Sequence, residues 1–243
     1  MPGHAHAPGG ADDPGVQAVA TRALDLVRDG SRVGLGSGRA SLAFITKLGE
    51  RVQQGFRIVG VPTSNASAQH ARDVGIPLIE LGEDVELDLT VDGADEVAPT
   101  LDLVKGWGGA LVRERIVASA SRRQVILVGE EKLVRTLGER GRIPVEVIPL
   151  ASGLVTRRLK ALDLVPTVRL DGGGQRPFIT DNGNLILDCA PRAPLSGARA
   201  ARDLEAAVLA IAGVVDTGLF LGTAERVLVG HPDGHIDILK RKD

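Results

Sequence analysis

Three carboxylates lie close together in the chain, at Asp92, Asp95 and Glu96. They follow an apolar segment, 87–91, whose pattern predicts a strand. Carboxylates this close repel one another, which destabilises a fold unless the crowding raises a pKa for proton transfer or the group binds a cation. The run therefore indicates acid-base chemistry, with a magnesium site or a solvated acidic loop as the alternatives.

A glycine-rich arch carries one ammonium group, Lys105, and leads into a predicted helix. The backbone N–H groups of Gly106, Trp107 and Gly108 are suited to holding an oxyanion or a hydroxyl. Glu114 lies in the first turns of that helix, where its neighbours at helical spacing are apolar. Burial there would raise the pKa of its carboxyl, which suits a general base working near neutral pH. The alternative is a surface glutamate paired with a neighbouring arginine.

A second glycine-rich segment, from Gly34 to Ser41, lies between a predicted strand and a predicted helix. Its backbone N–H groups and the positive end of the helix dipole favour phosphate as the bound group. The third glycine of the dinucleotide fingerprint would fall at Arg39, and the Gly-Lys-Ser/Thr of a P-loop is missing. Arg39 and Lys132 would add positive charge at a bound anion. A turn that only packs the helix, and an exposed lysine, are the alternatives.

The segments that must position these groups alternate between helical and strand patterns. The expected helices are 16–27, 41–48, 67–74 and 111–120, and the expected strands are 32–35, 57–61, 77–81, 87–91 and 124–128. This alternation predicts a parallel sheet with helices on both faces. Ligands of such sheets bind at the carboxyl ends of the strands, where the three motifs lie.

The regular alternation of predicted strands and helices ends after residue 142. The expected order is strand 145–148, helix 154–162, strands 167–170 and 185–189, helix 198–211 and strand 214–221. This is the ferredoxin-like split β-α-β unit, and its middle hairpin would turn through the Asn-Gly of 181–184. A last hairpin, 226–229 with 235–239, is expected to return to the first sheet.

The fold class is therefore α/β, a Rossmann-like parallel-sheet domain with an inserted ferredoxin-like α+β domain. We expect a mobile N-terminal tail over 1–15, a nucleotide-binding-like catalytic domain over 16–142 and 223–243, and a small domain over 143–222. His4 and His6 in the tail lack the further ligands of a metal site, so we expect them to be solvated.

Composition excludes several classes of protein. A formal charge of −2 argues against a nucleic-acid partner, because phosphate-backbone affinity needs an excess of Lys and Arg. Cys189 is the single cysteine, which rules out an intrachain disulfide and a thiolate metal cluster. No apolar run reaches the ~20 residues that span a bilayer, and 1–13 lacks the apolar core of a signal peptide. We expect a cytoplasmic protein with a small-molecule partner and no membrane association.

Taken in order, these motifs resemble those of the ribose-5-phosphate isomerase A family over nearly the whole chain. Similar runs also occur at 61–64, 144–149 and 180–184. The resemblance implies an enzyme of the non-oxidative pentose phosphate pathway that interconverts D-ribose 5-phosphate and D-ribulose 5-phosphate through an enediolate. It further implies that no metal or organic cofactor is used, and that the chain forms a homodimer or a higher homo-oligomer.

The resemblance also implies roles for individual residues. The family's proton-transferring base matches Glu114, its two active-site aspartates match Asp92 and Asp95, and the lysine of its glycine arch matches Lys105. The implied substrate contacts are Ser37, Gly38, Arg39, Ala40, Gly93, Ala94, Gly106, Trp107, Gly108 and Lys132.

The chain departs from the family pattern in three places. The first loop usually continues Gly-Ser-Thr where this chain has Gly38, Arg39 and Ala40, so two hydroxyls are lost and Arg39 stands in their place. The arch usually has a glycine where Trp107 stands. The loop after 124–128 usually has Asp and Ser where this chain has Gly129 and Glu131. Another aldopentose phosphate is therefore an alternative substrate.

Two other functions are weighed against catalysis. A sugar-phosphate-sensing module would need an attached DNA-binding element, and the segment 1–27 is too short for a helix-turn-helix. The presence of Glu114 with both aspartates also favours an enzyme. A nicotinamide-dependent dehydrogenase is disfavoured by the broken dinucleotide fingerprint.

Overall fold

The computed structural model describes residues 13–241. Most of the predicted tail, including His4 and His6, lies outside the described residues. The first helix, α1 (Pro14–Ala23), begins two residues before the predicted start of that helix at residue 16, so it includes the last two residues of the predicted tail. Its start is fixed by Asp13, whose carboxylate accepts a hydrogen bond of 3.1 Å from the backbone N–H of Val16. The short 3-10 helix η1 (Leu24–Leu26) continues it.

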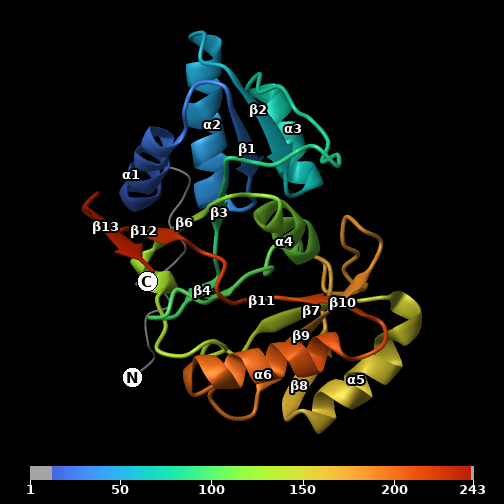
Figure 1. Ribbon diagram of the computed structural model, residues 1–243. Coiled ribbons are helices and arrows are strands. Elements are labelled where there is room, and N and C mark those ends of the chain that lie inside the picture. The colour runs from blue at the N-terminus through green and yellow to red at the C-terminus, as the bar shows by residue number, and fades with distance from the viewer. Residues whose placement is uncertain (1–12, 242–243) are drawn as a thin grey trace.

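A six-stranded sheet forms the larger domain, seen in the upper half of Figure 1. Its strands are β1 (Ser31–Leu35), β2 (Ile58–Pro62), β3 (Leu89–Gly93), β6 (Gln124–Gly129), β12 (Arg226–Gly230) and β13 (Ile236–Lys240). They lie in the order β13-β12-β6-β3-β1-β2, and all neighbours run parallel except β12 and β13. The last hairpin therefore returns to the first sheet, as the sequence predicted.

Helices cover both faces of this sheet. One core cluster joins the alternate strand residues Val33, Leu35, Leu89 and Val91 to α1, to α2 (Arg39–Gln53) and to α3 (Asn65–Asp73). The opposite face packs against α4 (Leu111–Ser119), through Leu111 and Val117. Because successive side chains of a strand alternate between faces, Thr90 and Asp92 of β3 are directed to the α4 side.

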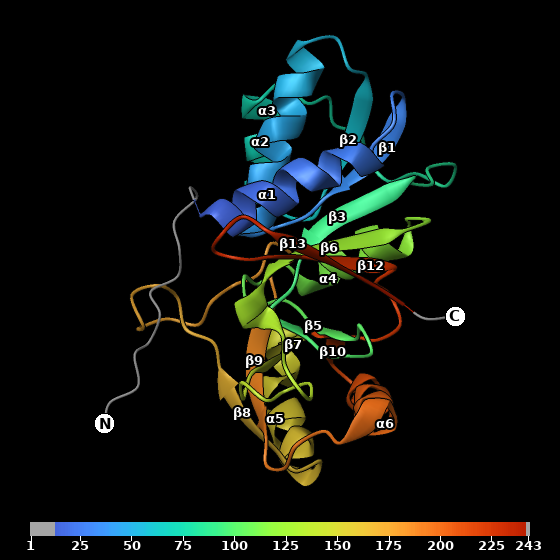
Figure 2. The same cartoon turned by 90° about the vertical axis from the view of Figure 1, so that its left-hand side faces the viewer.

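The smaller domain is a four-stranded antiparallel sheet with two helices, in the lower half of Figures 1 and 2. Its elements are β7 (Ile143–Val147), η3 (Pro149–Ala151), α5 (Ser152–Ala161), β8 (Leu164–Val168), β9 (Leu185–Pro191), α6 (Gly197–Leu209) and β10 (Val214–Thr217). The strand order β10-β7-β9-β8 and the β-α-β-β-α-β sequence of elements are those of the ferredoxin-like unit. The predicted fold class is confirmed.

Three local predictions differ from the structure. The expected strand 77–81 makes only an isolated bridge, between Leu78 and Gly60. The expected strand 214–221 divides at Gly218 into β10 and a separate β11 (Leu219–Phe220). The turn at 181–184 is present, with Gly183 at φ 79°, but a long loop, 169–184, joins β8 to β9.

A third, small sheet that the sequence did not predict connects the two domains. It contains β4 (Glu96–Val97), β5 (Leu103–Val104) and β11. Gly218 approaches the arch so closely that a Cβ there would lie 2.3 Å from the carbonyl oxygen of Lys105. The two backbones also exchange a hydrogen bond of 2.9 Å, from Lys105 N–H to Gly218 O. No helix among the described residues is both long and apolar enough to cross a membrane.

Candidate active site

The topology of the larger sheet creates a crevice at the ends of β1 and β3. From β1 the chain moves outward to β2, whereas β3 lies on the other side of β1. The loops that leave the two strands therefore diverge, and such a switch point is where ligands bind in open parallel sheets. A pocket of about 150 Å³ opens there.

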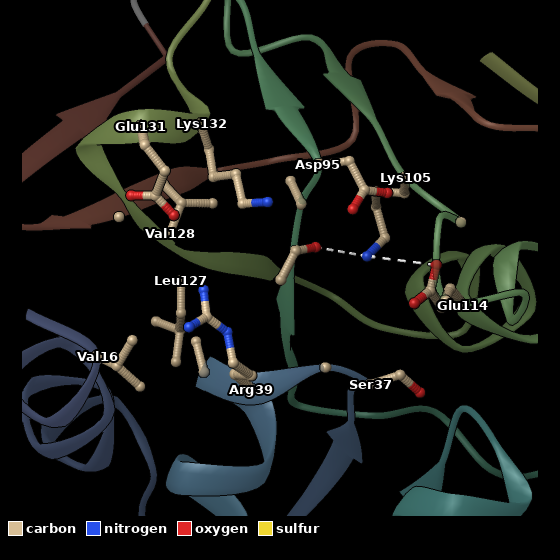
Figure 3. A pocket seen from close by; sticks show the side chains of 17 residues that line it. Val16, Ser37, Arg39, Asp95, Lys105, Glu114, Leu127, Val128, Glu131 and Lys132 are labelled. Atoms are coloured by element: carbon tan, nitrogen blue, oxygen red, sulfur yellow. Dashed lines mark hydrogen bonds and ion pairs between the residues drawn. The ribbon is translucent and has the colours of Figure 1, made fainter. Parts of the chain in front are cut away.

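Most of the predicted site residues line this pocket, as Figure 3 shows. Its lining residues are Val16, Ser37, Gly38, Arg39, Ala40, Gly93, Ala94, Asp95, Lys105, Gly106, Gly108, Glu114, Leu127, Val128, Gly129, Glu131 and Lys132. Two predicted site residues, Asp92 and Trp107, are not among them.

One side of the pocket is built around the buried ammonium group of Lys105. Its Nζ lies 2.9 Å from Oδ2 of Asp92 and 3.5 Å from Oε2 of Glu114, and it donates a 2.5 Å hydrogen bond to the carbonyl of Gly93. The side chain of Lys105 is only 2% exposed. Buried charges are tolerated only when paired in this way, so the three groups hold one another in a fixed geometry.

Asp92 lies behind Lys105, with no exposed surface. Its Oδ1 accepts hydrogen bonds from the backbone N–H groups of Ser37 (2.9 Å) and Gly93 (2.8 Å) and from the hydroxyl of Ser41 (3.3 Å). Gly36 lets the two loops approach, because a Cβ there would lie 2.2 Å from the same oxygen. Asp92 therefore anchors the ammonium group and does not face the pocket.

The carboxyl of Glu114 lines the pocket from the first turn of α4, and the residue is 5% exposed. Burial raises its pKa to about 8, and the negative charges of Asp92 and Asp95 add to the effect, while Lys105 opposes it. Burial lowers the pKa of Lys105, but Asp92 and Glu114 outweigh it and the net pKa is raised. The site thus combines a permanent cation with a carboxyl that accepts a proton near neutral pH.

Asp95 and the glycine arch complete this side. Burial raises the pKa of Asp95, against the opposing effect of a 2.8 Å hydrogen bond from the backbone N–H of Trp107. The indole of Trp107 points away, donating to the carbonyl of Arg142 at 2.9 Å, with its ring near the cations of Lys132 and Arg142. Trp107 therefore contributes its backbone to the site and its side chain to the packing behind it.

The opposite side of the pocket is cationic. Gly38, at φ 87°, is the N-cap of α2, and no side chain caps that helix end. Figure 3 shows Arg39 and Lys132 extending from different elements toward this side, with Glu131 beside Lys132. Lys132 belongs to the short 3-10 helix η2 (Glu130–Lys132) that follows β6. A helix N-terminus with two basic side chains is suited to an anion such as phosphate.

Glu96 makes its hydrogen bonds to a different part of the chain from Asp92 and Asp95, the other two carboxylates of the run. Its oxygens accept hydrogen bonds from the backbone N–H groups of Gly138 (2.6 Å) and Arg140 (2.9 Å), so it fastens a loop outside the pocket. Because Asp92, Asp95 and Glu96 are turned to different donors, they do not converge as the ligands of one magnesium ion would.

Four residues in or next to the pocket were not among the substrate contacts expected from the sequence, although two of them, Gly129 and Glu131, were noted there as departures from the family pattern. Ser37 Oγ hydrogen bonds to the hydroxyls of Thr63 (2.9 Å) and Ser64 (2.8 Å), which follow β2. Gly129 and Glu131 line the pocket after β6. The common signal is position, since all four follow the carboxyl ends of parallel strands.

Comparison with known proteins agrees with this architecture. Residues 59–234 match the family model described as ribose 5-phosphate isomerase A (phosphoriboisomerase A). Among curated relatives, ribose-5-phosphate isomerase A of Roseiflexus castenholzii is 46% identical over 228 residues, covering 90% of this chain and 93% of that protein. The protein of the same name from Gloeobacter violaceus is 47% identical over 224 residues, covering 92% and 94%.

Solved structures agree as well. Ribose 5-phosphate isomerase from Plasmodium falciparum superposes with a TM-score of 0.89 at 31% identity, covering 95% of this chain and all of that one. A D-ribose-5-phosphate isomerase in complex with phospho-erythronic acid gives a TM-score of 0.87 at 36% identity, covering 93% and 97%. With the matching family model and these relatives, the chain belongs to the ribose 5-phosphate isomerase A family.

Proposed function

We propose that the chain interconverts D-ribose 5-phosphate and D-ribulose 5-phosphate, with Glu114 as the base that moves the proton. The observation that carries this proposal is the pairing of Glu114 with the buried Lys105 on one side of a pocket whose other side is cationic. A sugar phosphate needs both sides, because its phosphate and its reacting carbons lie at opposite ends. The family of the chain supports the same reaction.

The chemistry is a proton transfer between adjacent carbons. Glu114, once ionised, removes the proton from C2 of the open-chain aldose, and the electron pair left behind forms the C1=C2 double bond of an enediolate. The carbonyl oxygen O1 takes up the negative charge. The protonated Glu114 then delivers its proton to C1 while the proton of the C2 hydroxyl passes to O1, which yields the ketose.

The developing charge is stabilised by donors fixed before the reaction begins. The ammonium group of Lys105 lies 3.5 Å from Glu114, so it is close to the carbons that this carboxyl reaches, and the arch N–H groups follow it directly. Such fixed dipoles and charges are worth more in a buried site than in water. Asp92 keeps Lys105 in place. Asp95 exchanges protons with the sugar hydroxyls and opens the ring.

The phosphate is assigned to the cationic side. The N-terminus of α2, with Ser37, Gly38, Arg39 and Ala40, supplies backbone N–H groups and one guanidinium, and Lys132 supplies a second cation. Arg39 takes the place of the two hydroxyls that the family pattern usually has in this loop. Because a guanidinium binds a phosphate with two parallel hydrogen bonds, it compensates for their loss.

The proposed reaction needs neither a metal nor an organic cofactor, since Lys105 and the arch supply the positive charge. Turnover of the purified protein on ribose 5-phosphate, followed by ketose formation with EDTA present, tests the proposal. Rapid turnover supports it, and turnover only on another aldopentose phosphate would make that sugar the substrate. Binding of ribose 5-phosphate without turnover on any aldopentose phosphate would instead indicate a sensing module.

Phospho-erythronic acid offers a second test of the same pocket. Its carboxylate carries the negative charge that the enediolate develops, and its phosphate is at the other end, so we expect competitive inhibition. Arg39→Ala should weaken its binding, whereas Arg199→Ala, on the exposed surface of α6, should not.

The chain is further proposed to work as a homodimer in the cytoplasm. Leu150 is 97% exposed in η3, and Ile148 beside it is 48% exposed. Apolar side chains this exposed are favourable to cover in an interface between copies of the chain. Sedimentation of the wild type should give twice the mass of the chain. Leu150→Glu should shift it toward the monomer if this patch is the interface, whereas Leu209→Glu on α6 should not.

A further inference from the structure

The turn between β12 and β13 brings together two imidazoles and a carboxylate that the proposed reaction does not use. His231 and His235 stand at the two ends of this turn, which is closed by a 3.0 Å hydrogen bond from His231 N–H to His235 O. Their rings stack with centroids 4.4 Å apart. Asp237 follows in β13, and the ligand atoms of the three residues all lie within 4.8 Å of one another.

The carboxylate of Asp237 lies beside both imidazoles. Asp237 Oδ2 lies 3.1 Å from Nε2 of His231, and Asp237 Oδ1 lies 3.3 Å from Nε2 of His235. On the other side of its ring, His231 Nδ1 lies 2.8 Å from Oε2 of Glu130, the first residue of η2. His231 is therefore held between two carboxylates.

This arrangement needs a positive charge. A neutral imidazole carries one proton, and a proton on Nδ1 of His231 donates to Glu130. The Nε2 lone pair then faces an oxygen of Asp237, which is also an acceptor. Two acceptors at 3.1 Å repel unless a proton or a metal ion lies between them.

We propose that His231, His235 and Asp237 bind one divalent transition-metal ion such as Zn²⁺. Two ligands at about 2.1 Å from a tetrahedral zinc are about 3.4 Å apart, and the two oxygens of Asp237 already lie 3.1 and 3.3 Å from the imidazole nitrogens of His231 and His235. Imidazole nitrogen with one carboxylate suits zinc and its neighbours better than magnesium. Glu130 supplies the carboxylate that usually accepts the remaining N–H of a metal-bound histidine and fixes its ring.

The proposed metal site is separate from the catalytic pocket but is linked to it through Glu130. None of the three proposed ligands lines the pocket, so basal isomerisation does not depend on the metal. Glu130 directly precedes Glu131 and Lys132, which do line it. A bound ion would fix His231, and through it Glu130, and so would hold η2 in one position.

Metal binding to the full chain, stripped with EDTA and then freed of it, tests the proposal. His4 and His6 lie outside the described residues, and any metal that their imidazoles took up would be counted in the same titration. The titration is therefore done in a His4→Ala/His6→Ala background as well as in the wild type. We expect one Zn²⁺ per chain in both by calorimetry, and a visible absorption spectrum from Co²⁺ with nitrogen ligands.

Single substitutions then assign the ligands. His235→Ala and Asp237→Asn change side chains that are 56% and 54% exposed, so they should leave the fold intact and abolish the stoichiometric site. Glu130→Gln should weaken it about 10- to 100-fold. His70→Ala, a histidine on α3 that hydrogen bonds to Thr46, should leave affinity unchanged.

Isomerase activity in EDTA should be unaltered in His235→Ala and Asp237→Asn, which shows that these variants are folded. The proposal is overturned if one Zn²⁺ still binds to both variants in the His4→Ala/His6→Ala background. The proposal is equally overturned if the wild type binds Zn²⁺ and the His4→Ala/His6→Ala protein does not, because the metal would then belong to the N-terminal segment.

Discussion

Glu114 is a carboxyl group whose surroundings determine what it can do. The apolar residues at helical spacing around it predicted burial, and the structure places it with 5% exposure beside a buried lysine. As a base it works only in the ionised form, yet burial holds its pKa at about 8. The rate of isomerisation should therefore depend on pH through this group.

We expect kcat/KM to rise with pH and to level off above about 8, the pKa of Glu114 in the free enzyme. Lys105 lowers that pKa, so Lys105→Met should move the rising limb to higher pH as well as reduce the rate. The pH dependence of kcat/KM in both proteins measures this. A limb that stays in place or moves to lower pH in the variant would contradict the assignment.

The same raised pKa makes the stability of the protein depend on pH. Between the ordinary value of 4.5 and the value of about 8, folded Glu114 keeps a proton that the unfolded chain has released. Stability contributed by this group therefore falls as pH rises through that window. In Glu114→Gln the loss is absent, so its free energy of unfolding relative to wild type should increase across the window and level off above it.

Urea unfolding of the two proteins, at pH values on either side of the window, measures this difference. A difference that does not change with pH would mean that the pKa of Glu114 is not raised in the folded protein. Asp233→Asn, in the exposed turn after β12, serves as a matched control for the removal of one carboxylate.

The site residues that the sequence identified are those that differ in type from the residues around them in the chain. Lys105, Arg39 and Glu114 each interrupt a glycine loop or an apolar stripe, and all three line the pocket. Thr63 and Ser64 carry hydroxyls of a kind found on any surface, so only the fold shows that they meet Ser37. The roles proposed for these residues remain predictions.

At the scale of elements, the site depends on loops that approach one another without side chains between them. Gly36 ends β1 against β3, and a Cβ at this position would lie 2.2 Å from Oδ1 and 2.5 Å from Cα of Asp92. Neither strand can move far, because β1 is paired on both sides. The anchor of Lys105 therefore depends on this glycine.

Gly36→Ala should lower the free energy of unfolding by about 1–3 kcal/mol and reduce kcat, since it displaces Asp92 and with it Lys105. Gly153→Ala is the matched control, because Gly153 lies in α5 with no atom within 4 Å of an added Cβ. That control should change stability by less than about 1 kcal/mol. Chemical unfolding and steady-state kinetics of both variants would show whether the close approach matters.

The apolar patterns predicted most of the long helices and strands to within about four residues, although α2 continues to Gln53, five residues beyond its predicted end. They could not predict β4, β5 and β11, which have two residues each and are too short to show a period. The bridge at Leu78 reads as a strand in the sequence but pairs through only one residue of β2. Pairing depends on the partner strand, which local sequence does not describe.

At the scale of the whole molecule, hydrogen bonds join the two domains. Asp181, in the turn of the small domain, accepts a 2.7 Å hydrogen bond from the backbone N–H of Asn65 in α3. Arg113 of α4 donates to the carbonyl of Asp181 at 2.8 Å and to Asn182 at 3.0 Å. The change of rhythm after residue 142 predicted a second domain, but contacts between distant segments leave no local signature.

The returning strand β12 is the other element that makes the larger domain whole. It lies between β6 and β13, and its residues reach both core clusters: Leu228 joins one, and Val227 and Val229 join the other. Leu228→Ala should reduce the free energy of unfolding by about 2–5 kcal/mol. Ile238→Ala on the neighbouring β13, where the side chain is 41% exposed, should reduce it by less than about 1 kcal/mol.

Equal decreases in the free energy of unfolding of these two variants, measured with urea, would contradict the claim that β12 is central to the larger domain. If the two domains unfold in separate transitions, a decrease in stability of the larger domain alone would still agree with this claim, because the small domain has its own apolar cluster.

The most direct test of the central claim follows the proton that Glu114 is proposed to move. Ribose 5-phosphate labelled with deuterium at C2 is incubated with wild type and with Glu114→Gln, and the loss of label from C2, either to C1 or to water, is followed along with the affinity for phospho-erythronic acid. We expect wild type to remove the label from C2 during isomerisation, and Glu114→Gln to be slower by about 10²- to 10⁴-fold with the inhibitor still bound. Loss of label from C2 at the wild-type rate in Glu114→Gln would show that another group is the base.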